Sequence, residues 1–259
     1  GSGESASGNG DAVSGNGESA SGNGDAASGN GESSSESRDA ASGSGGSGPG
    51  SDGVSSACRV VTVRDVEERR QFVRNRILDY AVYSKLLRRS FLIGNEIFFP
   101  EGLAYEDIYW GGLLNMYAGT ACITDAALYH YFVNRNATIL TSGANYHYDM
   151  LTVQEQLLSE YRRRGLMSEF HDEIELEFIY SCALAFWKIM ALRFDEPPYS
   201  MYLLLCTYVQ THFPDVKENP YVRGGALSEY YALILGSLLE PLTKSEFTGF
   251  AVNVKKIGL

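Results

Sequence analysis

The sequence predicts an α/β fold in which a small unit of strands and helices is followed by a helical region. Three observations support this prediction. The first 57 residues are almost entirely Gly, Ser, Ala, Asn, Asp and Glu, a composition that cannot build a core. Patterns typical of short strands and of amphipathic helices alternate up to residue 145, and only helical patterns follow. We therefore divide the chain into residues 1–57, 58–145 and 146–259.

The N-terminal tail, residues 1–57, repeats a seven-residue unit four times, starting at Ser7, Ser14, Ser21 and Ser28. The repeat has no apolar a or d position that could form a coiled-coil seam, so it predicts a disordered, acidic linker. A calcium-binding repeat is the alternative, because Asn and Asp recur beside Gly. One acid in each seven residues argues against that alternative.

The negative charge of the chain is concentrated in this tail, whose eight acids and one arginine give −7 of the net −11. The remaining residues are close to neutral, so we expect no nucleic-acid partner bound through a basic face. The chain shows no secretory signal pattern. Its most apolar run, residues 178–192, is shorter than the roughly 20 residues that span a membrane.

The four cysteines lie far apart, without a Cys-x-x-Cys pair or a histidine at the spacing of a zinc site. They are Cys58, Cys122, Cys182 and Cys206. This pattern is typical of free thiols in an intracellular protein.

Residues 59–63 predict a first short strand, and the spacing of apolar residues predicts a helix from Val66 to Tyr80. The mixed pattern of residues 81–92 assigns no element. Phe98 and Phe99 are expected to form a buried corner before the next helix.

A helix is predicted after Glu106, with a core-facing side made of Ile108, Leu113, Leu114 and Tyr117. Two short strands, rich in aromatic and β-branched residues, are predicted at residues 120–124 and 127–133. The helical region follows, and Gly and Pro interrupt its periodic segments. Its predicted helices are Met150–Arg164, Glu169–Phe194, Tyr199–Phe213 and Leu227–Leu239.

The stretch from Phe98 to Asp107 carries the clearest chemical signal. An apolar run, Pro100 and Gly102 lead to two adjacent carboxylates at the start of the predicted helix. A carboxylate fixed there, and kept charged by the helix dipole, suits a general base that takes a proton from an attacking hydroxyl. Local pattern alone favours the simpler interpretation that Glu106 and Asp107 are ordinary first-turn acids of a capping pair.

Neighbouring stretches make the sequence resemble a known family. They are Tyr83-Ser84-Lys85-Leu86-Leu87-Arg88-Arg89-Ser90-Phe91-Leu92, Phe98-Phe99-Pro100-Glu101-Gly102, Tyr105-Glu106-Asp107, and Leu128-Tyr129-His130-Tyr131 with Arg135 and Thr138. In order and spacing they match W-x-K-L-y-R-r-s-F-l, F-p-E-G-l-x-y-E-D and l-Y-x-Y-x-x-R-x-x-S. The chain thereby resembles the family 2 glycosyltransferases of the GT-A fold, especially bacterial enzymes of surface polysaccharides.

The resemblance implies part of a Rossmann-like domain that transfers a sugar from a nucleotide-sugar donor to a glycan or lipid-linked acceptor, with inversion. It implies that Asp107 is the general base and that Glu106 orients the acceptor or the base. It places Tyr105, Arg135 and Thr138 at the acceptor or the diphosphate. The location it implies is cytoplasmic, at the inner face of the plasma membrane, with a peripheral membrane association.

The sequence departs from the family most clearly in lacking any Asp-x-Asp. The family uses this motif to hold a divalent cation, Mg²⁺ or Mn²⁺, together with the sugar diphosphate. Milder departures are Tyr83 in place of Trp and Thr138 in place of Ser. The resemblance covers roughly residues 60–240, so we expect the C-terminal, acceptor-side portion of a longer enzyme, inactive alone and without a metal site of its own.

A function of a different class stays open, namely a non-catalytic module or remnant that docks on a partner transferase or a membrane surface. Basic side chains outnumber acidic ones between residues 59 and 89, which suits a diphosphate or an anionic membrane. A solvated helix face is the plainer interpretation of these charges. His147-Tyr148-Asp149 offers either a metal ligand or a helix cap at Asp149, and we favour the cap.

Overall fold

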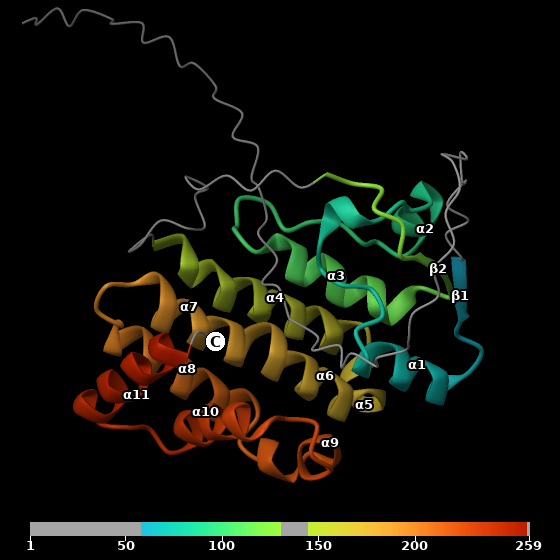
Figure 1. Ribbon diagram of the computed structural model, residues 1–259. Helices are drawn as coiled ribbons and strands as arrows, with labels where there is room; N and C mark the ends of the chain where they lie inside the picture. Colours follow the sequence, from blue (N-terminus) through green and yellow to red (C-terminus); the bar gives the residue numbers. More distant parts are fainter. Residues whose placement is uncertain (1–57, 131–144, 258–259) are drawn as a thin grey trace, which may run out of the picture.

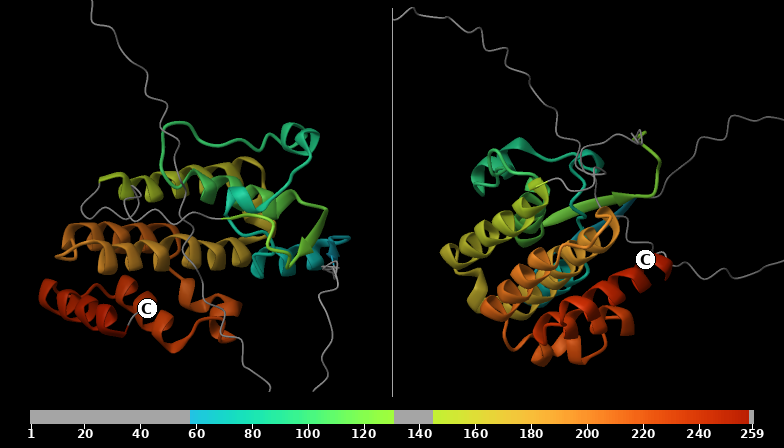
Figure 2. Two further views of the ribbon diagram at one scale, coloured as in Figure 1. Left: turned by 45° about the horizontal axis from the view of Figure 1, so that its top comes forward. Right: turned by 90° about the vertical axis from the view of Figure 1, so that its left-hand side faces the viewer.

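Helices dominate the computed structural model, which describes residues 58–130 and 145–257 (Figure 1). Its longer helices lie in three layers (Figures 1 and 2). They are α3 (Glu106–Tyr117) and α4 (Asp149–Arg163) in the first layer, α6 (His171–Phe178) and α7 (Ala185–Arg193) in the second, and α8 (Tyr199–His212), α10 (Glu229–Leu239) and α11 (Lys244–Ile257) in the third. The predicted helical region is confirmed. The predicted α/β unit keeps only a two-stranded sheet within the described residues.

The sheet is an antiparallel pair of β1 (Cys58–Thr62) and β2 (Thr120–Thr124), in which Val60 lies opposite Cys122. Both strands agree with the prediction. The further strand expected at residues 127–133 is wrong over 127–130, which form no strand, and residues 131–133 lie outside the described part. Aromatic residues favour a strand only where a neighbouring edge pairs with it, and no described strand pairs with this segment.

Two of the cysteines form a disulfide, which corrects the expectation of free thiols. Cys58 is bonded to Cys122 across a sequence separation of 64 residues, with a Cα–Cα distance of 6.0 Å. Cys182 and Cys206 are free and buried. The pairing could not be predicted from the spacing of the cysteines, because the register of β1 on β2 is what brings Cys58 and Cys122 together.

The first helix, α1 (Val66–Arg74), begins where the sequence predicts and ends six residues early. Asp65 caps it, accepting a hydrogen bond from the backbone N–H of Glu68 at 2.8 Å. Arg76 has a left-handed backbone (φ 45°), and the chain reverses there instead of continuing to Tyr80.

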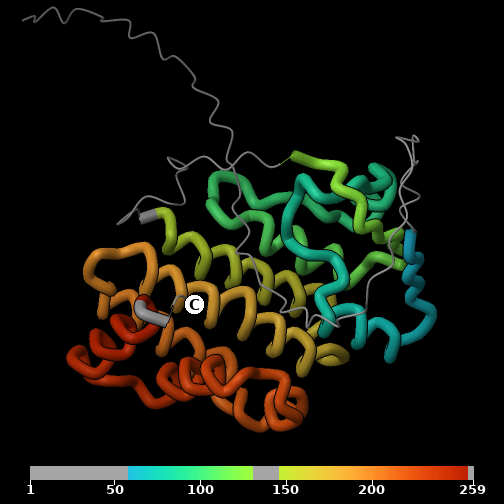
Figure 3. The backbone as a smooth tube through the Cα atoms, viewed as in Figure 1, coloured from blue at the N-terminus to red at the C-terminus, as the bar shows by residue number. Residues whose placement is uncertain are grey.

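Between α1 and α3 the chain follows an irregular path (Figure 3), broken by a 3₁₀ turn, η1 (Val82–Ser84), and the short α2 (Arg89–Gly94). The buried corner expected at Phe98 and Phe99 is wrong, since these side chains are 56% and 41% exposed. Ile97 is buried in their place, and the ring of Phe99 stacks on Trp110 at 5.0 Å. Three apolar residues in a row cannot all face one core from an irregular segment.

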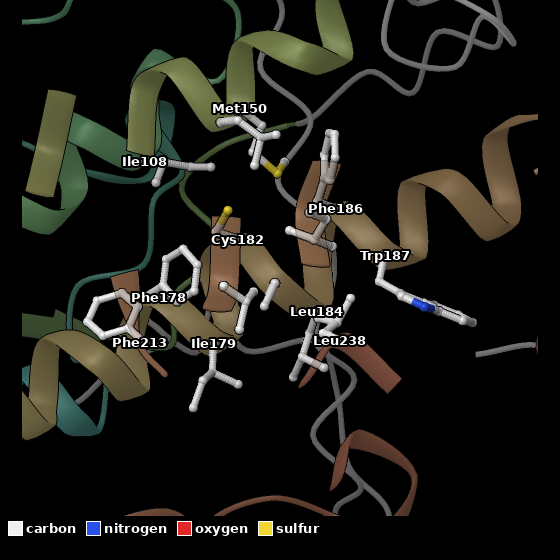
Figure 4. Packing of buried hydrophobic residues seen from close by; sticks show 14 of the residues in the cluster. Ile108, Met150, Phe178, Ile179, Cys182, Leu184, Phe186, Trp187, Phe213 and Leu238 are labelled. Atoms are coloured by element: carbon white, nitrogen blue, oxygen red, sulfur yellow. The ribbon is translucent and has the colours of Figure 1, made fainter. Parts of the chain in front are cut away.

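The C-terminal helices, together with α3, enclose one hydrophobic core (Figure 4), which includes Ile108, Phe178 and Trp187. The helix predicted over Glu169–Phe194 is continuous only from α6, through a π-helical turn, into α7. Shorter elements complete the region: α5 (Leu166–Glu169), the π-helical η4 (Ile179–Leu184), α9 (Pro220–Arg223), and the 3₁₀ turns η3 (Asn145–Tyr148) and η5 (Val216–Glu218). Within the described residues, no helix combines the length and the apolar character needed to cross a bilayer.

The helix α3 lies close against a buried polar network. The carboxylate of Glu177 accepts hydrogen bonds from the hydroxyls of Tyr80, at 2.9 Å, and Tyr161, at 3.0 Å. Gly111 and Gly112 of α3 face these two tyrosines, and a Cβ on Gly112 would lie 2.5 Å from the Tyr161 hydroxyl. The absence of side chains at both glycines therefore lets α3 approach, and this packing fixes the helix whose first turn carries the candidate base.

Candidate functional site

The backbone turns sharply before α3. Gly102 and Tyr105 both have left-handed conformations, with φ of 72° and 64°. Glycine adopts this conformation without strain, whereas a tyrosine there costs about 1–2 kcal/mol. Tyr105 occupies the N-cap position without a side-chain cap, and its carbonyl accepts a hydrogen bond from the N–H of Ile108 at 3.1 Å. Neither carboxylate of the predicted capping pair stands at the N-cap position itself.

Asp107 is almost completely buried in the first turn of α3, with 5% of its surface exposed. Burial, and next the negative charge of Glu106, raise the pKa of Asp107 from 3.8 to about 6. The backbone N–H groups of Ile108 and Asp107 and the charge of Lys85 act in the lowering direction. Glu106 beside it is half-buried. Asp107 is thus an acid that is mostly ionised at neutral pH but titrates close to it.

Two interactions connect the family-like stretches, one between the first stretch and Asp107 and one between the first and the last stretch. Lys85, from the first stretch, is close enough for its charge to act on Asp107, and its ammonium is held by the Ala81 carbonyl at 2.7 Å. The ring of Tyr83, from the same stretch, stacks on Tyr129 of the last stretch at 4.8 Å. The sequence pattern places Lys85 only among the basic side chains of residues 59–89 that suit a diphosphate or an anionic membrane.

Tyr105 and His147 form a hydrogen bond between the phenol and Nδ1, with the two atoms 2.6 Å apart. His147 has no exposed surface, and its Nε2 has no hydrogen-bond partner within the described residues. Burial, and then the positive charge of Arg193, lower the pKa of His147, while burial raises the pKa of Tyr105. Both groups are therefore neutral near pH 7. An unpartnered buried polar atom costs about 1–3 kcal/mol.

Asp149 binds the turn before α3 and does not cap its own helix. Its Oδ2 accepts a hydrogen bond from the backbone N–H of Ala104 at 3.0 Å. The N-cap residue of α4 is Tyr148, and it has no side-chain cap. The cap expected at Asp149 is therefore wrong, because its carboxylate accepts a hydrogen bond from the backbone of Ala104, 45 residues earlier in the chain.

The structure places only some of the site residues predicted from the sequence. Glu106 and Asp107 lie together at the start of α3. Tyr105 is half-buried and bonded to His147, so its hydroxyl is already engaged. Arg135 and Thr138 lie outside the described residues.

Two of the basic side chains between residues 59 and 89 bind within the fold, whereas Arg59, Arg64, Arg76, Arg88 and Arg89 are exposed, as a solvated face predicts. Arg70 forms an ion pair with the buried Glu173 at 2.8 Å. Arg69 donates a hydrogen bond to the backbone carbonyl of Asn115 at 2.7 Å. These arginines attach α1 to α6 and α3, so neither is available for a diphosphate or a membrane.

Among the described residues, one group has the side chains of a metal site. The ligand atoms of His171, Asp172 and Glu175 lie within 4.8 Å of one another. Glu175 already accepts a hydrogen bond from Asn219 at 2.7 Å, and His171 Nδ1 lies 3.4 Å from Asp172. Acidic groups of this kind occur without an ion, so we assign no metal to them.

Compared with protein-family models, with curated proteins and with solved structures, the chain gives no significant match.

Proposed function

We propose that this chain is the acceptor side of a glycosyltransferase of the family 2 type, with Asp107 as its general base. The observation that carries the proposal is the burial of Asp107 in the first turn of α3, with a pKa of about 6. A base is most efficient when its pKa lies near the working pH. An ordinary first-turn acid stands in water and needs neither burial nor a raised pKa.

In the proposed reaction, the acceptor hydroxyl oxygen attacks the anomeric carbon from the face opposite the leaving group. Asp107 takes the proton of that hydroxyl as the new C–O bond forms. The bond between the sugar and the diphosphate breaks, the nucleoside diphosphate leaves with the electron pair, and the configuration at the carbon inverts. Glu106, half-buried beside the base, orients the acceptor hydroxyl or Asp107.

The GT-A-like assignment of residues 58–145 belongs to the same proposal. Its support is the action of the Lys85 charge on Asp107 and the stacking of Tyr83 on Tyr129, which connect residues of three family-like stretches. Arg135 and Thr138 remain proposed contacts of the acceptor or diphosphate. The chain contains no Asp-x-Asp. Its residues therefore do not fit the divalent cation of the family, and no step is assigned to that ion.

A glycan or a lipid-linked acceptor is proposed, and the second suits a peripheral membrane association. Leu86 and Phe98 are exposed apolar side chains, and Arg88 and Arg89 are exposed cations in the same segment. Such a combination favours a surface of anionic lipid. The Cys58–Cys122 disulfide counts against a cytoplasmic location, because such bonds persist in oxidising compartments.

The test is transfer activity of the protein at its full natural length, with a panel of nucleotide sugars and glycan or lipid-linked acceptors. Asp107→Asn removes the base without changing the size of the side chain. We expect transfer to fall about 10²–10⁴-fold, with donor binding unchanged. The matched control is Asp215→Asn, since Asp215 is exposed and its side chain caps no helix. Unchanged turnover in Asp107→Asn would exclude the assignment.

A non-catalytic docking module is the second candidate. It is favoured by the core of the C-terminal helices, and by the unpaired outer edges of β1 and β2 within the described residues. An open strand edge is a surface on which another chain can add a strand. This function predicts no transfer with any donor, and equal binding of wild type and Asp107→Asn to a partner transferase, measured by calorimetry.

A further inference from the structure

Two hydrogen bonds attach the turn before α3 to the corner at the start of α4. The backbone N–H of Ala104 donates to Asp149 Oδ2 at 3.0 Å, and the Tyr105 hydroxyl lies 2.6 Å from His147 Nδ1. Both partners follow more than 40 residues later in the sequence. The turn is thus fixed from outside its own segment.

Unfavourable features concentrate at this corner. Tyr105 has a left-handed backbone, His147 is fully buried with Nε2 unpartnered within the described residues, and Asp107 is a buried carboxylate. Backbone strain and unsatisfied polar groups persist where the surrounding structure holds them, and they gather at functional sites. Tyr105, the residue with the strained backbone, is held by the hydrogen bond between its hydroxyl and His147.

The position of Asp107 follows from that of Tyr105. The two are separated by one residue, and the first hydrogen bond of α3 runs from the Ile108 N–H to the Tyr105 carbonyl at 3.1 Å. A relaxation of the left-handed Tyr105 would therefore turn the peptide that starts the helix. The carboxylate of Asp107 would then move toward solvent.

We propose that His147 is a positioning residue, which through its hydrogen bond to Tyr105 holds Asp107 in the buried place from which it accepts the proton. This inference rests on the proposed function. It gives Tyr105 a structural task in place of the acceptor contact expected from the sequence, and it gives His147 a task that the sequence did not reveal. His147 touches neither the reacting atoms nor Asp107; it acts through Tyr105.

The groups that face His147 keep the contact neutral. The ring lies 4.5 Å from that of Tyr146, 5.8 Å from that of Phe194 and 6.1 Å from that of Tyr105. The charge of Arg193 opposes protonation of the imidazole. Both effects favour the neutral imidazole, whose Nδ1 can accept the hydrogen bond from the Tyr105 hydroxyl.

The inference is tested by the titration of Asp107, followed by carboxyl ¹³C NMR on the full chain. In the wild type we expect a pKa near 6. In Tyr105→Phe, which loses only the hydroxyl, and in His147→Phe, the carboxylate gains solvent and its pKa shifts toward about 3.9. His147→Asn keeps a polar atom near the place of Nδ1, so we expect it to restore part of the shift.

The control is Tyr148→Phe, which removes an exposed hydroxyl next to His147 in the sequence and should leave the titration unchanged. A merely structural role would lower the melting temperature in Tyr105→Phe and leave the pKa of Asp107 near 6, and that result overturns the inference. Should His147→Phe fail to fold, Tyr105→Phe alone decides. An Asp107 that titrates near its ordinary value in the wild type also overturns it.

The inference and the proposed function fail separately. The titration requires no substrate, so a shift in Tyr105→Phe supports the positioning contact even if Asp107→Asn retains full transfer. In an active enzyme, Tyr105→Phe is expected to lower kcat about tenfold with the acceptor KM nearly unchanged, because a displaced base affects the transition state more than binding. If Asp107→Asn loses transfer activity as expected while Tyr105→Phe leaves the pKa of Asp107 unchanged, the proposed function is supported. The positioning role of the Tyr105–His147 hydrogen bond is then excluded.

Discussion

Asp107 is kept in the fold at a cost in stability. Its folded pKa of about 6 lies above the ordinary 3.8, so the folded state binds this proton more tightly than the unfolded chain does. The favourable contribution of the protonated group is complete below about pH 4 and is lost as the pH rises through 6. At neutral pH the protein therefore contains an ionised carboxylate with little solvent around it.

Asp107→Asn is accordingly expected to stabilise the protein at pH 7.5, by about 3 kcal/mol, because the amide carries no charge to bury. At pH 4 the gain should disappear, since the wild-type carboxyl is then protonated. Thermal unfolding of both proteins at the two pH values measures the effect. The control variant Asp215→Asn should leave the melting temperature unchanged at both pH values. A melting temperature that falls equally at both pH values would show that Asp107 is a stabilising cap.

The residues of the site that lie in one continuous stretch could be predicted from the sequence, and those that contact it only through the fold could not. Glu106 and Asp107 follow a recognisable turn, so they were found. His147 was considered only as a metal ligand or as a neighbour of a cap, because its contact with Tyr105 spans 42 residues. The burial of Asp107, which changes its chemistry, depends on how the surrounding segments pack and is invisible in the local pattern.

At the scale of elements, α3 depends on close packing over the Glu177 network. Both Gly111 and Gly112 face aromatic side chains, and the second lies against Tyr161 and Leu157 of α4. In isolation, paired glycines weaken a helix. Here they allow the approach that buries one side of α3.

Gly112→Ala is expected to destabilise the protein by about 2 kcal/mol, since the new Cβ would lie 2.5 Å from the Tyr161 hydroxyl and 2.9 Å from Leu157. The matched control is Gly236→Ala in α10, where no atom lies within 4 Å. It should stabilise by about 0.5–1 kcal/mol, as alanine favours a helix. Urea unfolding of the two variants gives the comparison, and the same sign for both would contradict the packing argument.

The helices could be predicted where apolar periodicity was long, as in α4, α8 and α10. The predicted helix ends and buried positions are wrong where a tertiary contact or an unusual backbone conformation determines the structure. The left-handed Arg76 ends α1 early, although the apolar pattern continues to Tyr80. The exposed Phe98 and Phe99 belong to an irregular segment whose direction no periodicity fixes. The π-helical η4 interrupts a regular pattern without changing its composition.

At the scale of the whole molecule, the disulfide closes a long stretch of chain. Cys58 and Cys122 enclose α1, η1, α2 and α3. A two-stranded ribbon has little stability of its own in water. The bond therefore contributes by restricting the unfolded chain as well as by holding β1 on β2.

Reduction of the disulfide is expected to lower the free energy of unfolding by about 4 kcal/mol, the loss of loop entropy for a sequence separation of 64 residues. Cys58→Ser should show the same loss and should be insensitive to reductant. Urea unfolding with and without a phosphine reductant measures both. Thiol titration in denaturant provides the check, with two free thiols before reduction and four after it. Four thiols without reductant would show that the bond is absent.

The Cys58–Cys122 disulfide also determines how a force applied to the N-terminal tail is transmitted to the folded part of the protein. Cys58 is the first residue of β1, so force on the preceding chain would otherwise peel this strand from β2 one residue pair at a time. The cross-link passes the load directly to Cys122, beyond the end of α3. The two strands are then stretched together instead of being separated. A protein tethered by this tail is thus held at two positions 64 residues apart in its sequence.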